Sequence, residues 1–117
     1  MKKIYYLSTC NTCMRIIAEL NLPEEFILQD IKTEPITTAQ IEDMRALTDR
    51  YESLFSKRAR LYKELDLKNK SLSEDDYKKY ILEYYTFLKR PVILLNNQIF
   101  IGNSKKTVEA AKLAIHE

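Results

Sequence analysis

The chain has 117 residues, a length at which a single domain with one hydrophobic core is usual. Its 19 basic and 17 acidic residues leave a net charge of only +2, so charge gives no reason to expect nucleic-acid binding. No apolar run approaches the roughly 18 residues of a membrane span. We therefore expect one soluble domain covering residues 1–117, with neither a membrane nor a nucleic acid as partner.

The beginning of the chain also bears on the compartment. The apolar stretch Ile4–Leu7 is shorter than the apolar region of a signal peptide, which has about 7 to 15 residues. We therefore expect a cytoplasmic protein. In that reducing compartment, two cysteines separated by two residues indicate redox or metal chemistry rather than a structural disulfide.

The first third of the chain predicts a strand, a helix and a second strand. Lys3–Leu7 is a short apolar run typical of a buried strand, and it leads directly to Cys10. A helix follows from Thr12 to about Asn21, and Phe26–Ile31 is the second strand. The apolar face of the helix has spacings of three and four residues: Cys13, Ile16, Ile17 and Leu20.

The middle of the chain predicts a helical insertion at about residues 37–88. Thr37 and Gln40 have the spacing of a capping box and begin one helix. The segment from about Tyr51 to Leu67 is expected to be helical, with a basic outer side. Ser73 caps a further helix. Its aromatic and apolar side chains form one stripe along the helix: Tyr77, Tyr80, Ile81, Tyr84, Phe87 and Leu88.

The last third predicts two strands and a helix. Residues 92–95 and 98–101 are apolar runs separated by Asn96-Asn97, and asparagine tolerates the positive φ of a tight hairpin turn. Ser104 caps the final helix. The order βαβ, helical insertion, ββα predicts an α/β protein with a thioredoxin-like fold, in which helices flank a mixed four-stranded sheet.

Cys10 and Cys13 are the candidate reactive pair. Cys10 stands at the N-terminus of the first helix, where unpaired backbone N–H groups and the helix dipole favour a thiolate. Cys13 lies one turn further on the same side, so it can attack a mixed disulfide on Cys10. The spacing predicts Cys10 as the nucleophile and Cys13 as the resolving thiol.

Two other interpretations of the pair stay open. Both cysteines could be small buried hydrophobes, as cysteines often are. They could also bind zinc, but a structural zinc site normally has four protein ligands, and His116 is the only other cysteine or histidine in the chain. We expect no metal.

The sequence resembles the arsenate reductase (ArsC)/Spx family of thioredoxin-fold proteins over essentially its whole length. The resemblance rests on Tyr5–Arg15 with its two cysteines, Leu54–Arg58 with Tyr62–Leu65, and Leu88–Leu94 followed by Ile101–Gly102. It implies a reactive Cys10, an Arg90 that lies near Cys10, and a cis peptide bond at Pro91. A guanidinium near a thiol would lower the thiol pKa and could bind an oxyanion.

Candidates for substrate contact are Arg90, Arg58, and the two residues between the cysteines, Asn11 and Thr12. Glutaredoxin-linked arsenate reductases use three arginines for arsenate, and Ser56 and Gly102 stand here at the positions matched to the other two. In Spx-type regulators a glycine contacts RNA polymerase, and Arg50 stands at the matching position.

The resemblance implies a thiol-disulfide oxidoreductase of the arsenate reductase type. It would reduce an oxidised substrate, which could be arsenate. Its partner and external reductant would be glutathione, glutaredoxin or thioredoxin, with no bound cofactor. The alternative is an Spx-like redox-sensing regulator that binds RNA polymerase or another protein.

Overall fold

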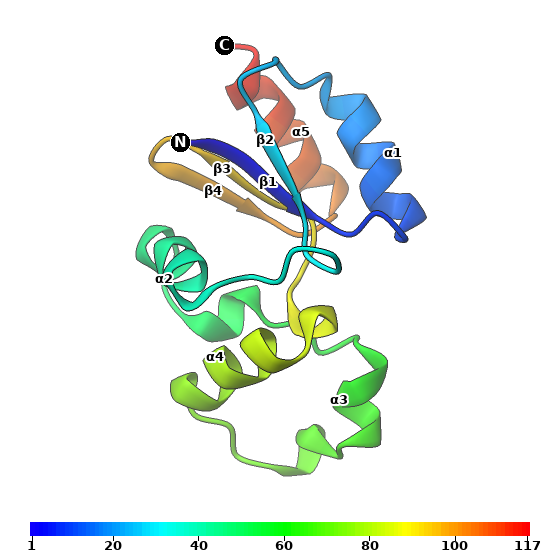
Figure 1. Ribbon diagram of the computed structural model, residues 1–117, viewed down its shortest axis with the longest axis vertical. Coiled ribbons are helices and arrows are strands. Elements are labelled where there is room, and N and C mark those ends of the chain that lie inside the picture. The colour runs from blue at the N-terminus through cyan, green and yellow to red at the C-terminus, as the bar shows by residue number, and fades with distance from the viewer. The chain divides into compact units, whose positions relative to one another are not determined.

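The computed structural model describes residues 1–117. The chain divides into two compact units, Met1–Glu34 with Arg90–Glu117 and, inserted between these segments, Pro35–Lys89. No helix is both long enough and apolar enough to cross a membrane. We call the two parts unit 1 and unit 2 and describe each by itself (Figure 1).

Unit 1 consists of a mixed four-stranded sheet and two helices. The strand order is β2-β1-β3-β4, with β1 parallel to β2 and antiparallel to β3, and β3 antiparallel to β4. The fold predicted from the sequence is confirmed. Its elements are β1 (Lys2–Tyr6), α1 (Asn11–Leu20), β2 (Ile27–Asp30), β3 (Val92–Leu95), β4 (Gln98–Ile101) and α5 (Lys105–Ile115).

Helices α1 and α5 lie on the same side of the sheet (Figure 1). Their apolar faces pack with inward-facing residues of β1 and β3, because an amphipathic helix buries its apolar face on the sheet. This core of unit 1 contains Ile4, Ile16, Leu20, Phe26, Ile93, Leu95, Val108 and Ala111. The core fixes α1 on the sheet and thereby fixes the position of its N-terminus.

The turns of unit 1 follow the residue types that the sequence places there. Asn96 has φ +55° in the two-residue turn between β3 and β4, which confirms the predicted hairpin. The Ser104 hydroxyl accepts a hydrogen bond from the Thr107 N–H at 3.2 Å and caps α5. The Arg90-Pro91 peptide bond is cis, as the resemblance implied.

Unit 2 is a group of short helices around an aromatic core. The elements are α2 (Thr38–Leu47), α3 (Arg60–Glu64), α4 (Glu74–Glu83) and the 3-10 helices Tyr51–Leu54, Leu67–Asn69 and Tyr85–Phe87. The ring of Phe55 stacks on Phe87 at 4.9 Å and meets Tyr77 and Tyr62 edge-on. The predicted capping boxes at Thr37 and Ser73 are both present.

The structure refines one prediction for unit 2 and contradicts another. The segment expected to be helical from about Tyr51 to Leu67 contains the short helices Tyr51–Leu54 and Arg60–Glu64, and a third, Leu67–Asn69, begins at its end. The helix that Ser73 begins ends at Glu83, so Phe87 and Leu88 lie beyond it. Backbone pairing with Phe55 accounts for this end, since Leu88 forms a β-bridge with Phe55 and the Lys89 N–H donates to the Leu54 carbonyl at 2.8 Å.

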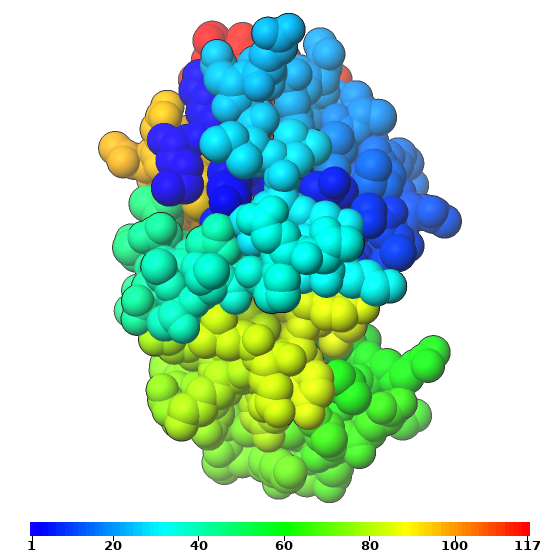
Figure 2. All heavy atoms as spheres, viewed as in Figure 1, coloured from blue at the N-terminus to red at the C-terminus, as the bar shows by residue number.

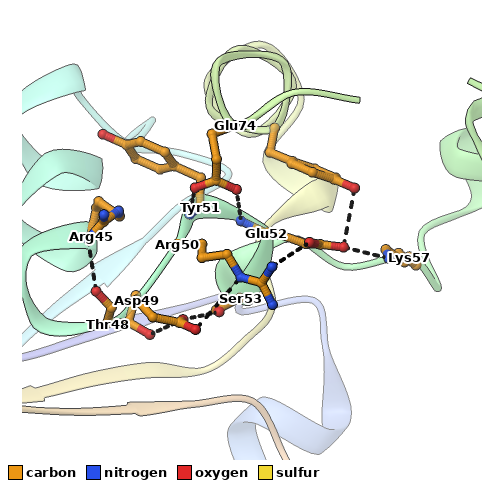
Figure 3. A network of polar contacts seen from close by, with 10 residues as sticks. Arg45, Thr48, Asp49, Arg50, Tyr51, Glu52, Ser53, Lys57 and Glu74 are labelled. Atoms are coloured by element: carbon orange, nitrogen blue, oxygen red, sulfur yellow. Dashed lines mark hydrogen bonds and ion pairs between the residues drawn. The ribbon is translucent and has the colours of Figure 1, made fainter. Parts of the chain in front are cut away.

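A polar network holds the 3-10 helix Tyr51–Leu54 against α4 (Figure 3). The Glu74 carboxylate accepts hydrogen bonds from the backbone N–H groups of Tyr51 and Glu52, at 2.6 and 3.2 Å. The Glu52 carboxylate in turn binds Lys57 at 2.8 Å. Glu74 thus caps the exposed N–H groups that begin the short helix.

Candidate active site

The two cysteines lie at the start of α1 in unit 1. Cys10 is the N-cap residue of the helix, with an extended backbone, and its carbonyl accepts the first helical hydrogen bond from the Met14 N–H at 3.1 Å. Cys13 lies one turn later and is fully buried, whereas Cys10 is partly exposed. Both are free thiols. A reagent in solvent can therefore reach Cys10 more easily than Cys13.

Several groups act on the pKa of the Cys10 thiol. Partial burial on its own would raise that pKa. The Cys13 backbone N–H, the Cys13 thiol, the Arg90 charge and the Thr12 backbone N–H all stabilise the thiolate, and together they hold the pKa of Cys10 below its usual value. The N–H groups at the start of α1 thus act as expected for a helix N-terminus.

The pKa of Cys13 shifts in the opposite direction. Burial is the main cause, and the negative charge of the neighbouring Cys10 sulfur adds to it, so that the pKa of Cys13 rises to about 11. Cys13 therefore keeps its proton at neutral pH and donates a hydrogen bond to Cys10. The lower of the two pKa values therefore belongs to the accessible Cys10 sulfur, and the higher one to the buried Cys13 sulfur.

Arg90 lies within electrostatic range of both sulfurs, because its charge lowers the pKa of each cysteine. Unit 1 thus brings together the three residues predicted as catalytic. Arg90 is half-buried and immediately precedes the cis bond to Pro91. The Pro91 carbonyl accepts a hydrogen bond from the Gly102 N–H at 2.9 Å. Gly102 has φ +94°, a conformation that favours glycine.

The candidate substrate-contact residues differ in their positions. Asn11 is exposed as the first residue of α1, and Thr12 is half-buried and faces Cys10 with its backbone N–H. Arg58 lies in unit 2, on an exposed turn before α3. Substrate contact by these three side chains stays a prediction.

Sequence reasoning missed two polar residues beside the cysteine-bearing turn. The Ser8 hydroxyl donates a hydrogen bond to the Asp30 carboxylate at 2.5 Å, and Asp30 is the last residue of β2. A signal was available: β1 and β2 are parallel, so their carboxyl ends meet at one edge of the sheet. Polar residues following β1 and ending β2 are therefore neighbours.

The structure contains no group of three or more histidine, cysteine, aspartate or glutamate side chains arranged to hold a metal ion. His116, considered above as a possible ligand, lies with its Nε2 atom 2.7 Å from the Leu20 carbonyl oxygen. The residues around the two thiols do not complete a zinc site.

The comparison with protein families agrees with this geometry. The model of the ArsC family matches residues 5–111, which is nearly the whole chain. The chain belongs to the ArsC family. The matched range includes both cysteines, Arg90 and Pro91.

Two curated proteins similar to the chain are transcriptional regulators. The global transcriptional regulator Spx of Streptococcus pneumoniae is 23% identical over 112 residues, covering 94% of this chain and 84% of the regulator. Spx of Bacillus subtilis is 24% identical over 110 residues, with 92% and 84% covered.

Solved structures of similar proteins have the same fold. An arsenate reductase from Vibrio cholerae superimposes with a TM-score of 0.78 at 20% identity, covering 97% of this chain and 96% of that one. A possible arsenate reductase from Streptococcus mutans gives a TM-score of 0.72 at 26% identity, with 90% and 92% covered. The thioredoxin-like fold of the ArsC family is thus established for this chain, with Cys10 and Cys13 at the start of α1.

Proposed function

We propose that the protein is a thiol-disulfide oxidoreductase of the arsenate reductase type, acting in the cytoplasm. The observation that carries the proposal is the opposite shift of the two thiol pKa values: lowered at the accessible Cys10 and raised to about 11 at the buried Cys13. A thiolate is the nucleophilic form of cysteine, so the lowered pKa favours that form at Cys10, next to a protonated second thiol.

The reaction has two balanced steps. The Cys10 thiolate attacks one sulfur of a substrate disulfide, forming a mixed disulfide and releasing the other sulfur as a thiolate. The Cys13 sulfur, after losing its proton, attacks the Cys10 sulfur and releases the second substrate thiolate. The substrate gains two electrons, and the protein loses two as a Cys10–Cys13 disulfide.

The charge on Cys10 also sets the order of the steps. That charge is one cause of the raised pKa of Cys13. Once Cys10 is part of a mixed disulfide it is neutral, so the pKa of Cys13 falls and the second attack becomes easier. We propose that glutathione, glutaredoxin or thioredoxin then reduces the internal disulfide, and that no cofactor is bound.

Arsenate is a possible substrate, with Arg90 as the residue that would hold its oxyanion. The proposal places Asn11, Thr12 and Arg58 as further substrate contacts. With Ser56 and Gly102 at the positions of two family arginines, we expect disulfides to be reduced faster than arsenate.

The test is a coupled assay. Purified protein is given NADPH, a thioredoxin or glutathione reducing system, and either a small disulfide or arsenate. We expect NADPH consumption that requires Cys10 and is lost in Cys10→Ser. Absence of turnover with every substrate and reductant would contradict the proposal.

A second function is favoured by the two Spx relatives. We propose as the alternative a regulator in which the same disulfide changes affinity for RNA polymerase. Arg50, at the position of the Spx glycine, is 60% exposed and pairs with Asp49 and Glu52 at 3.7 and 3.6 Å (Figure 3). Capture of RNA polymerase that changes between reduced and oxidised protein, without turnover, would support this alternative.

A further inference from the structure

The turn that carries Cys10 is tied to the neighbouring strand β2. Tyr6 of β1 is paired with Asp30 of β2, and the Tyr6 carbonyl accepts a hydrogen bond from the Ile31 N–H at 2.9 Å. The chain then leaves β1, and the Ser8 hydroxyl donates to Asp30 Oδ2 at 2.5 Å. The Cys10 N–H closes the turn on the Leu7 carbonyl at 3.0 Å.

The Asp30 carboxylate is itself held in place. Its second oxygen, Oδ1, accepts a hydrogen bond from the Lys32 N–H at 3.1 Å. The Ser8 hydroxyl is the main cause that keeps the pKa of Asp30 below its usual range, with help from the Lys32 backbone N–H. At neutral pH Asp30 is therefore an ionised acceptor, with one oxygen bonded to the segment that follows β2 and the other to the cysteine-bearing turn.

The hydrogen bond between Ser8 and Asp30 lies outside the hydrophobic core. Ser8 is exposed and Asp30 is half-buried, and in Figure 2 blue atoms from the start of the chain are open to view at the surface. The apolar core of unit 1 contains neither residue. The bond thus constrains the turn rather than the packing of the sheet.

We propose that Asp30 is a positioning residue for the Cys10 thiolate, acting through Ser8. By holding Ser8, the carboxylate fixes the backbone from Ser8 to Cys10. This keeps the Cys10 sulfur close to the backbone N–H groups of Thr12 and Cys13. The proposal rests on the proposed function, because it concerns the reactivity of that thiolate. A loose turn lets the sulfur leave these donors and lowers the fraction of reactive thiolate.

The negative charge of Asp30 has the opposite effect to its hydrogen bond on the stability of the Cys10 thiolate. A negative charge disfavours any thiolate near it, so removing the Asp30 charge alone cannot raise the pKa of Cys10. Two variants separate the effects. Ser8→Ala removes the hydrogen bond and keeps the charge, whereas Asp30→Asn removes the charge and leaves an amide that can still bond to Ser8.

The experiment measures the rate of Cys10 alkylation by neutral iodoacetamide as a function of pH, with each cysteine followed separately by mass spectrometry. We expect Ser8→Ala to slow Cys10 at neutral pH by about threefold to tenfold, the range that corresponds to one hydrogen bond. The midpoint of its pH profile should move upward. Asp30→Asn should react at least as fast as the wild type.

Two control variants test whether the Ser8 hydroxyl itself is responsible. Ser8→Thr restores a hydroxyl and should recover most of the wild-type rate. Thr9→Ala removes an exposed hydroxyl from the same turn and should leave the rate unchanged. A slow Ser8→Ala variant that Ser8→Thr does not rescue would show that the hydroxyl is not responsible, and would overturn the proposal.

The outcomes distinguish this proposal from the proposed function. If Cys10 of the wild type reacts no faster at neutral pH than an ordinary free thiol, the proposed function itself fails. If the wild type is fast and Ser8→Ala is equally fast with the same pH profile, the proposed function stands and Asp30 has no positioning role.

Discussion

Cys10 and Cys13 differ by only one helical turn, yet the fold gives them opposite properties. Cys10 ends an extended segment where helix N–H groups are free to stabilise its charge, and Cys13 is fully buried within α1. The same hydrogen bond between the two sulfurs lowers one pKa and raises the other. The asymmetry thus follows from one residue being the N-cap and the other the first buried position.

The first prediction concerns the reactivity of the two thiols. Since the pKa of Cys10 is lowered and that of Cys13 is raised to about 11, Cys10 should be alkylated much faster at neutral pH. As pH rises, the Cys10 rate should reach its plateau first, and the Cys13 rate should still increase near pH 11. Iodoacetamide labelling followed by peptide mass spectrometry measures both. Equal rates for the two thiols would contradict this prediction.

The second prediction concerns Arg90. Its positive charge lowers the pKa of Cys10, so Arg90→Ala should move the midpoint of the Cys10 pH profile upward. A general effect on the thiolate slows neutral and charged electrophiles by a similar factor, whereas an oxyanion site gives a loss specific to arsenate. We expect the general effect, with weak arsenate binding in the wild type.

The measurement is Cys10 reactivity toward iodoacetamide and toward arsenate in wild type and Arg90→Ala. Lys89→Ala, one residue earlier and exposed, is the matched control for loss of a positive charge. Micromolar arsenate binding that disappears in Arg90→Ala, with an unchanged iodoacetamide rate, would show a dedicated arsenate site instead.

At the scale of elements, capping residues set where the helices begin. The Ser73 hydroxyl accepts from the Asp76 N–H at 3.1 Å, and the Asp76 carboxylate accepts from the Ser73 N–H at 2.9 Å. This reciprocal pair satisfies two N–H groups that a helix start otherwise leaves to solvent. It begins α4, the helix that supplies Glu74 to the network in Figure 3.

The third prediction tests that cap. Ser73→Ala should lower the free energy of unfolding by about 1 kcal/mol, the usual effect of removing a serine N-cap. Ser71→Ala, an exposed serine two residues before the cap, should change it little. Urea denaturation followed by circular dichroism measures both. Equal stability of the two variants would contradict a role for the cap.

The pH dependence of the cap has a definite sign. Hydrogen bonds from the Ser73 backbone and hydroxyl lower the pKa of Asp76 in the folded chain. The stabilisation from ionised Asp76 is therefore fully present above the ordinary aspartate range and is lost as pH falls through the lowered value. Asp76→Asn should weaken the pH dependence of unfolding between pH about 5 and 2.

Local signals predicted most of the elements, and long-range pairing explains where they did not. Thr37, Ser73 and Ser104 were identified because a cap is decided by residues within one turn. The end of α4 could not be predicted, since it depends on pairing of Phe55 with Leu88, 33 positions later in the chain. The hydrophobic periodicity that continues past Glu83 cannot predict pairing with a distant segment.

In the candidate site, too, local signals identified some residues and long-range pairing explains those that were missed. Cys10 and Cys13 followed from their spacing at a predicted helix start, and the nearness of Arg90 was implied by family resemblance alone. Asp30 and Ser8 were missed because their contact requires the parallel pairing of β1 and β2 in a fixed register. The register brings together residues 22 positions apart, and neither has a motif of its own.

At the scale of the whole molecule, all the groups that act on the two thiols come from unit 1, which is formed by the two ends of the chain. The first segment supplies the cysteines and Asp30, and the last supplies Arg90 and Pro91. Sheet pairing of β1 with β3 joins the segments. The environment of the two thiols therefore depends on both segments of unit 1, because neither segment alone contains both strands.

The last prediction concerns the oxidised form of the whole protein. Cys10 and Cys13 are the only cysteines, and the thiolate of Cys10 lies within hydrogen-bond reach of the Cys13 sulfur. Once Cys10 is oxidised, the Cys13 sulfur is present at a far higher effective concentration than any thiol of a second molecule. Mild oxidation should therefore give a monomer with an internal disulfide and no free thiol.

Intact-mass measurement should show the loss of two hydrogen atoms, and a thiol titration should find none free. Cys13→Ser is the matched variant: with no resolving thiol, its oxidised Cys10 should instead form covalent dimers or mixed disulfides that non-reducing electrophoresis detects. Covalent dimers as the main product of the wild type would contradict the prediction, because the two sulfurs would then be unable to meet within one chain. Closure in the wild type and its loss in Cys13→Ser would together assign the resolving role to Cys13.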